Sequence, residues 1–264
     1  FTETALLTGQ SLLQPKQNDL GHLLGRPEIA ADLESVARLI NGRVVLVTGA
    51  GGSIGSELSR QIAEYGPSEL ILADASEFHL YKLDMELREH YPQIRMVTSL
   101  ANVRDRARVE SIFERFRPNL VFHTAALKHV PIVEGNPVEG VKTNLLGTRN
   151  VAEAAVKYGV SNFVMISTDK AVNPTNVMGA SKRAAEAYCQ SLDIACQTTL
   201  FTTVRFGNVL GSSGSVVPRF EKQIAAGGPV TVTHPEITRF FMTIPEAVCL
   251  VLNAAAAYAG RKRG

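Results

Sequence analysis

A carboxylic acid and an amine stand side by side where an apolar, strand-like run ends. The run 162–167 leads directly into Thr168-Asp169-Lys170. Such a pair can serve as general acid and general base if both side chains reach one substrate. Desolvation would favour the neutral forms that this chemistry needs, whereas an ion pair between Asp169 and Lys170 would oppose them. The alternative interpretation is a salt bridge in a surface loop.

A glycine-rich turn is the second chemical feature. The β-branched run 44–47 is followed by three glycines in the spacing GxxGxxG, and a helix is expected directly after them. Glycine combines positive φ with close backbone approach at little cost, and a helix N-terminus offers free N–H groups to a pyrophosphate. In this context the motif predicts a dinucleotide site. The site is expected to comprise Gly49, Gly52, Ser53, Ile54 and Gly55.

Polar and small residues after the next three predicted strands complete this site. Asp74 ends the second strand, where a carboxylate accepts hydrogen bonds from ribose hydroxyls and repels a 2′-phosphate, which favours NAD over NADP. Asn102, with Val103 beside it, follows the third strand and could meet the adenine edge. Ala125 and Ala126 follow the fourth strand and suit a backbone that passes close to the cofactor, although packing alone could explain them.

An alternation of short apolar runs and amphipathic segments positions these residues. Strands are expected at 44–47, 70–73, 95–98, 120–123, 162–167 and 199–205. Helices are expected at 56–65, from the second strand to 90, and at 105–116, 137–158, 175–195 and 245–258. Apolar runs between amphipathic helices predict a parallel sheet covered on both faces. Right-handed crossovers make this a Rossmann-like, doubly wound α/β fold.

The chain divides into three parts. Residues 1–41 lack a strand signal and hold only weak helical pieces such as 29–40, so we expect a lead-in segment. Residues 42–207 are expected to form the NAD-binding Rossmann domain. Residues 208–264 are expected to form a partial, small C-terminal substrate-binding lobe over the strand ends, where ligands bind in such sheets. Its helix 245–258 could pack on the Rossmann domain.

Composition narrows the function. The chain has 264 residues, 45% of them hydrophobic, which suffices for one full core. A net charge of +2 gives no electrostatic case for nucleic acid. The three widely spaced cysteines indicate reduced thiols, and no metal-ligand spacing is present. No signal peptide or bilayer-spanning stretch is visible. Because the chain begins with Phe1, we expect it to be processed or cut from a longer protein.

The motifs together resemble a known superfamily. The glycine turn, a strand-five Ser/Thr and the helical Lys182 resemble the extended short-chain dehydrogenase/reductases, which normally carry Tyr where this chain has Met178. The whole set resembles one family within it, the membrane-associated bacterial polysaccharide-biosynthesis 4,6-dehydratases that act on UDP-N-acetylglucosamine. The resemblance covers roughly residues 20–260. It rests on segments 23–27, 47–58, 125–131, 167–182, 205–212 and 239–242.

The resemblance implies a reaction. NAD⁺ oxidises the sugar at C4, loss of the C5 proton and the C6 hydroxyl eliminates water, and the hydride returns to C6, with C5 configuration retained. Asp169 is implied as the acid at C6, Lys170 as the base at C5, and Lys182 as a ligand of the nicotinamide ribose. Thr168 is placed to hydrogen-bond O4. Since the thioether of Met178 cannot take a proton, Thr168 with a water, or Asp169, must accept the O4 proton.

Contacts to the UDP-sugar are less sharply defined. Residues after strand four could touch the sugar or line a loop, and a polar residue in the long helix could position the catalytic region. Arginine forks suit a diphosphate, and within the small lobe Arg239 and Asn208 are favoured. The candidates are Lys128, His129, Asn144, Asn208, Arg219 and Arg239.

The resemblance also implies a location and leaves alternatives open. A membrane-spanning N-terminal region would place the enzyme at the cytoplasmic face of the bacterial inner membrane. A homo-oligomer is left open by the sequence. One alternative function is a nucleotide-sugar C4 epimerase, which usually needs a Tyr base, so Met178 and the Asp169-Lys170 pair count against it. The other is an inactive NAD-binding fragment.

Overall fold

The core of the fold is a parallel sheet whose strand order reverses near its middle. The computed structural model describes residues 24, 26, 32–212, 216–232, 234, 236 and 239–259. Six strands pair in the order β3-β2-β1-β4-β5-β6, all parallel. Ligands bind at such a reversal, beyond the carboxyl ends of the strands. The strands are β1 Val44–Thr48, β2 Glu69–Asp74, β3 Arg95–Leu100, β4 Leu120–His123, β5 Asn162–Thr168 and β6 Leu200–Phe206.

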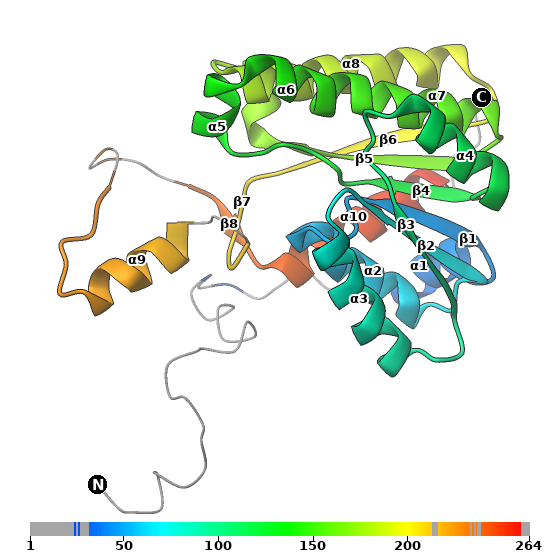
Figure 1. The fold of residues 1–264 in the computed structure, drawn as a ribbon, viewed down its shortest axis with the longest axis horizontal. Coiled ribbons are helices and arrows are strands. Elements are labelled where there is room, and N and C mark those ends of the chain that lie inside the picture. Colours follow the sequence, from blue (N-terminus) through cyan, green and yellow to red (C-terminus); the bar gives the residue numbers. More distant parts are fainter. Residues whose placement is uncertain are drawn as a thin grey trace, which may run out of the picture.

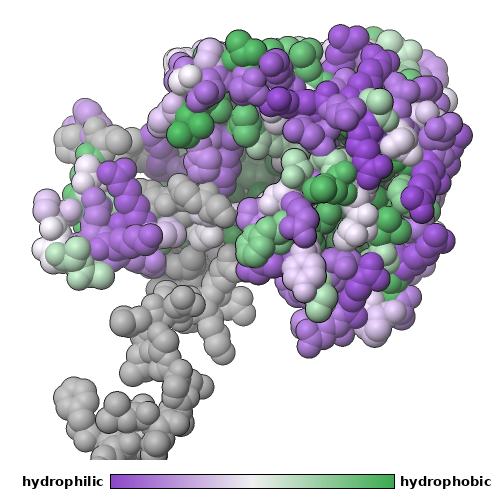
Figure 2. All heavy atoms as spheres, viewed as in Figure 1, coloured by the Kyte–Doolittle hydropathy of each residue, from purple (hydrophilic) through white to green (hydrophobic). Residues whose placement is uncertain are grey.

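Helices cover both faces of this sheet, as the continuous apolar runs predict. In Figure 1, α4, α7 and α8 lie above the sheet, and α1, α2, α3 and α10 lie below it. Each face has its own buried cluster, one holding Leu58, Ile62 and Val251, the other Phe113 and Phe163. Hydrophilic side chains dominate much of the visible outer surface (Figure 2). The principal helices are α1 Leu33–Ile40, α2 Ser53–Glu64, α3 Glu77–His90, α4 Arg106–Phe116, α7 Thr148–Lys157, α8 Val177–Ala195 and α10 Ile244–Ala259.

The end of the expected lead-in segment belongs to the core. Asp32 caps α1 by accepting a hydrogen bond from the backbone N–H of Ser35. Val36 and Ile40 of α1 are fully buried in the same cluster as apolar residues of α10. The local sequence pattern does not predict this packing, because α10, the partner of α1, lies more than two hundred residues further along the chain. Residues 1–23, 25 and 27–31 of the expected segment, including the start of the helical piece expected at 29–40, lie outside the described residues.

The single helix expected at 137–158 is divided. It forms α6 Pro137–Val141, a π-helical turn Lys142–Gly147 and then α7. Inside the wider turn, the hydroxyl of Thr148 donates to the carbonyl of Asn144 (2.7 Å). The glycine at its end allows tight packing, since a Cβ on Gly147 would lie 2.6 Å from a methyl group of Val103. Such π-turns often occur at functional sites.

The part after β6 is small. The strands β7 Asn208–Val209 and β8 Phe241–Met242 form a parallel pair. The helix α9 Val216–Ala225 stands apart from the main body (Figure 1). The helix α10 returns to the sheet, where its residues Val248 and Leu252 join the core. Within the described residues, no helix is long and apolar enough to cross a membrane.

Candidate active site

The chain turns sharply at the carboxyl end of β5. Asp169–Ala171 form one 3₁₀ turn, and the hydroxyl of Thr168 accepts a hydrogen bond from the backbone N–H of Lys170 (3.3 Å). The same hydroxyl donates to Asp169 Oδ1 (2.9 Å). Lys170 Nζ lies 2.9 Å from that oxygen as well. The three residues therefore form one hydrogen-bonded group in which the ion pair is made.

This group sets the resting charge of the carboxyl. Burial alone would raise the pKa of Asp169, but hydrogen bonds from Lys170 and Thr168 outweigh it and hold that pKa below its usual value. Both bonds go to Oδ1, and no bond to Oδ2 is found within the described part of the chain. Asp169 is therefore ionised at rest and has to gain a proton before it can act as an acid.

The pair is braced from two directions. Asn208 of β7 accepts a hydrogen bond from Lys170 Nζ (3.3 Å), which ties the small lobe to the strand-five turn. On the other side, α8 approaches so closely that a Cβ on Gly179 would lie 2.2 Å from the carbonyl oxygen of Lys170. The glycine at position 179 is thus required by backbone contact.

Met178 and Lys182 share the inner face of α8, as their spacing predicts. Both side chains are buried, at 3% and 4% exposure. Burial lowers the pKa of Lys182 to about 8. No hydrogen bond to its ammonium is found among the residues that the structure describes. A buried amine that makes no hydrogen bond within the described part of the chain can donate to a ligand hydroxyl, as expected for a ribose.

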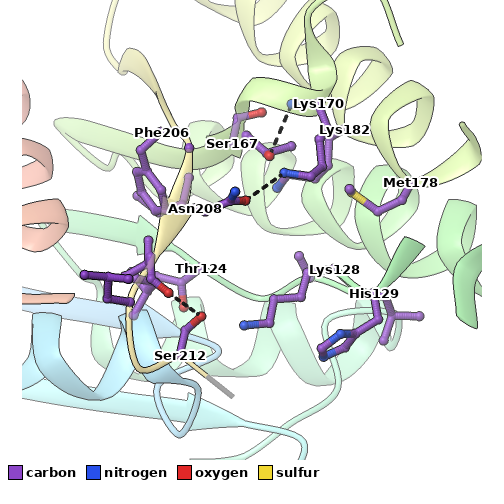
Figure 3. Close-up of a pocket in the computed structure, with 18 of the residues that line it drawn as sticks. Thr124, Lys128, His129, Ser167, Lys170, Met178, Lys182, Phe206, Asn208 and Ser212 are labelled. Carbon is purple, nitrogen blue, oxygen red and sulfur yellow. Dashed lines mark hydrogen bonds between the residues drawn. The ribbon is translucent and has the colours of Figure 1, made fainter. Parts of the chain in front are cut away.

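These side chains line one cavity of about 340 Å³. Lys128 and His129 lie across it from Met178 and Asn208 (Figure 3). Partial desolvation lowers the pKa of Lys128, although its side chain keeps access to solvent. Asp169 is not part of the lining; it is hydrogen-bonded to Thr168 and Lys170, which are. The expected site residues in the lining are Ile54, Ala126, Lys128, His129, Thr168, Lys170, Met178, Lys182 and Asn208.

The glycine turn has the predicted geometry for close approach. Gly49 has φ +70°, and a Cβ there would lie 2.6 Å from the backbone nitrogen of Ala125. A Cβ on Gly55 would lie 2.1 Å from the carbonyl oxygen of Gly49. Gly52 is the N-cap of α2 and provides no side-chain cap. The helix α2 therefore begins at Ser53, and the free N–H groups of its first turn are available to a ligand.

The other expected cofactor residues surround this turn. Asp74 Oδ2 accepts from the backbone N–H of Gly51 (2.8 Å), and its Oδ1 accepts from that of Ser76 (2.8 Å). Its carboxylate is thereby fixed next to the glycine turn. Asn102 Oδ1 accepts from the backbone N–H of Arg104 (3.0 Å), and Val103 is buried against Gly147. Their contact with an adenine stays a prediction.

The remaining substrate candidates divide into a positioning residue and two exposed cations. Asn144 is fully buried, and its side-chain amide accepts from the backbone N–H of Leu127 (2.8 Å) and donates to Ser181 Oγ (3.0 Å). It therefore joins the loop that carries Lys128 to α8. Arg219 and Arg239 are exposed and do not line the cavity, so their diphosphate contact stays a prediction.

A buried histidine was missed by the sequence reasoning. His123 ends β4 and is fully buried between Thr48 (2.7 Å) and Thr148 (2.9 Å). Because Thr148 donates its only hydroxyl proton to Asn144, it accepts from His123 Nε2–H, which assigns the tautomer. Burial lowers the pKa of His123 to about 3. The neutral ring thus links β1, β4 and the π-turn; the strand-end position of His123 was the available signal.

Three further residues of the lining were not among the expected site residues. Ser167 is buried, and its hydroxyl lies close enough to the Glu186 carboxylate to help lower the pKa of that group. Phe206 and Phe241 supply aromatic surface from β6 and β8. From sequence alone, an aromatic residue in a strand is expected to pack in the core, so only the fold shows that these two face the cavity. No group of His, Cys, Asp or Glu in the described ranges could hold a metal ion.

The reversed parallel sheet, the glycine turn and the buried Lys182 define a Rossmann-like protein of the extended short-chain dehydrogenase/reductase class. Within that class the chain belongs to the family described as "Polysaccharide biosynthesis protein", whose match covers residues 45–262. This agrees with the family that the sequence motifs resemble.

Individual relatives give the family context. The chain is 52% identical over 242 residues to the capsular polysaccharide biosynthesis protein CapD of Staphylococcus aureus, covering 91% of this chain and 40% of CapD. It is 36% identical over 219 residues to an inverting UDP-N-acetylglucosamine 4,6-dehydratase of Campylobacter jejuni, covering 81% of this chain and 64% of that protein. The chain thus spans about two fifths of the length of CapD.

A solved structure shows the same fold with a cofactor. The UDP-glucose 4-epimerase of Thermus thermophilus, in complex with NAD, superposes with a TM-score of 0.65 at 26% identity. The match covers 77% of this chain and 71% of the epimerase. The expected Rossmann-like fold is confirmed.

Proposed function

We propose that the chain carries the catalytic domain of an NAD-dependent UDP-N-acetylglucosamine 4,6-dehydratase that serves surface polysaccharide synthesis. The observation that carries this proposal is the Thr168-Asp169-Lys170 group at the rim of a cavity that also holds Lys182. A simple dehydrogenase or epimerase needs a base only for the hydroxyl that is oxidised, whereas elimination of water needs a further acid and base at the neighbouring carbons. The Campylobacter jejuni relative named for this activity supports the choice.

The residues around the glycine turn fit NAD. Its close-packed glycines and the start of α2 suit a pyrophosphate, and Lys182 suits the nicotinamide ribose. The fixed carboxylate of Asp74 suits ribose hydroxyls and disfavours a 2′-phosphate, so NAD is preferred to NADP. When bound there, NAD supplies the hydride chemistry, accepting hydride from C4 and returning it at C6.

The protein's own residues then move the protons. The O4 proton passes to Thr168 Oγ while the Thr168 proton moves along its existing hydrogen bond to Asp169. Oxidation at C4 therefore converts the resting carboxylate into the acid that the next step requires. Asp169 then gives this proton to the C6 hydroxyl, and water leaves. Met178 takes no part in this transfer because a thioether does not titrate.

Lys170 acts as the base at C5, where the C4 ketone makes the proton acidic. The C4 ketone stabilises a carbanion at C5. Lys170 first loses its ammonium proton to solvent, and the neutral amine then removes the C5 proton. Protonation of Asp169 weakens the ion pair that holds the ammonium, which favours this form. Lys170 returns the proton to C5 when hydride reaches C6. The balance closes, because the O4 proton and the C6 hydroxyl leave as water. Retention at C5, as implied by Met178, would require delivery from the original face.

The product distinguishes the candidate functions. We expect the full-length protein to convert UDP-N-acetylglucosamine into a product lighter by one water. An unchanged mass with a new configuration at C4 would instead establish the C4 epimerase, and tight NAD binding without product would establish an inactive binder. Asp169→Asn and Lys170→Ala should each lower kcat at least ~100-fold, as for loss of a general acid or base. Lys157→Ala, in an exposed ion pair on α7, is the control.

A further inference from the structure

A buried carboxylate at the start of α10 is neutralised from the far end of the chain. The side chain of Glu246 is 0% exposed. Its two oxygens lie 2.6 Å and 3.2 Å from the guanidinium nitrogens of Arg26, 220 residues away in sequence. The backbone N–H of Glu246 also donates to Thr243 Oγ, which fixes the first helical turn. A charge buried this deeply depends on its partner.

The same guanidinium reaches the wall of the cavity. Arg26 lies 3.5 Å from the carbonyl oxygen of Phe241, a β8 residue that lines the cavity. The strand β8 pairs with β7, where the backbone N–H of Asn208 donates to the Phe240 carbonyl (3.1 Å). Asn208 in turn binds Lys170. A continuous set of contacts therefore leads from Arg26 to the amine at the centre of the site.

The segment that carries Arg26 is held along α10 at a second point. The backbone N–H of Asp32 donates to Asn253 Oδ1 (2.9 Å). Immediately after it, α1 buries Val36 and Ile40 in the cluster that α10 shares. The two described attachments, at Arg26 and at Asp32, lie in the first turn of α10 and near its middle.

We propose that Arg26 is a positioning residue: its ion pair with Glu246 fixes the junction of β8 and α10 and thereby holds Asn208 against Lys170. Arg26, which precedes the expected Rossmann domain in the sequence, is then part of the active-site framework. The effect on catalysis rests on the proposed function, but the effect on the position of β7 does not.

Hydrogen–deuterium exchange on the full-length protein tests this position directly. For Arg26→Gln we expect faster exchange in peptides covering 206–212 and 240–249, and unchanged exchange at the glycine turn, 44–60. Arg38→Gln, which removes an exposed ion pair with Glu34 on α1, is the matched control and should change neither region. If Arg26→Gln exchanges at 206–212 at the same rate as the wild type, the proposal is overturned.

A double variant separates position from charge burial. Arg26→Gln/Glu246→Gln removes both charges, so its thermal midpoint should recover relative to Arg26→Gln while exchange at 206–212 stays high. If the thermal midpoint and the exchange at 206–212 both returned towards wild-type values, Arg26 would only neutralise Glu246, and the proposal would fail. In the activity assay, Arg26→Gln should lower kcat about tenfold or more, Arg26→Lys should restore much of it, and NAD affinity should not change. An inactive wild type would refute the proposed function and leave the exchange result valid.

Discussion

At the scale of single residues, the hydroxyl of Thr168 has the most specific role. It accepts from the Lys170 backbone and donates to Asp169 Oδ1, so its proton already points along the proposed path. Thr168→Val keeps the shape but removes this path. We expect kcat to fall by about 10²-fold or more with unchanged NAD affinity, and Thr168→Ser to keep most activity. Equal rates for the Val variant and the wild type would remove Thr168 from the mechanism.

Lys182 predicts a pH dependence of stability. Its folded-state pKa, about 8, lies below the unfolded value of 10.5. The unfolded chain therefore binds the proton more tightly between these values, and this contribution to stability rises as pH increases from about 8 towards 10.5. The slope should be on the order of 1 kcal/mol per pH unit.

Chemical denaturation at several pH values measures this contribution. The free energy of unfolding of the wild type minus that of Lys182→Met should become more favourable to the wild type between pH 8 and 10 in the absence of cofactor. Taking the difference cancels the other groups that titrate in this range. A difference that is flat with pH would show that the Lys182 ammonium is not desolvated.

At the scale of elements, the contact between α8 and the strand-five turn can be tested at one glycine. A methyl group at residue 179 would meet the Lys170 carbonyl, so Gly179→Ala should push α8 away from the catalytic turn. We expect a loss of about 1–3 kcal/mol in stability, as for overpacking, with a large fall in kcat. Gly135→Ala, where a Cβ meets nothing within 4 Å, is the control. Similar effects of both changes would contradict the argument.

The elements also show what a sequence reveals. Strand β5 and the start of α8 were predictable because their signals are local, namely an apolar run and a cap followed by a helical face. The π-turn was not predictable, because Asn144 adopts it to bind Leu127 and Ser181, which are distant in sequence. Likewise, the sequence shows that Asp169 and Lys170 are neighbours. The charge state of Asp169 depends also on the hydrogen bond from Thr168, which the sequence does not show.

At the scale of the whole molecule, segments from both ends of the chain meet at one wall of the cavity. Arg26 and α1 both contact α10, and β8, which precedes α10, contributes Phe241 to the lining. The domain order along the sequence therefore does not describe how the site is built. For this reason no local sequence pattern predicted that α1 joins the core or that Arg26 contacts Glu246.

The central claim is that Lys170 removes a proton from C5 of a UDP-sugar as water is lost. Conversion of UDP-N-acetylglucosamine by the full-length protein in heavy water tests it most directly, with mass spectrometry and proton NMR of the product. The Lys170 amine exchanges its protons with solvent, so the product should lack one water and carry deuterium at C5, and Lys170→Ala should give neither. A product that keeps its oxygen, or that loses water with only hydrogen at C5, would contradict the account.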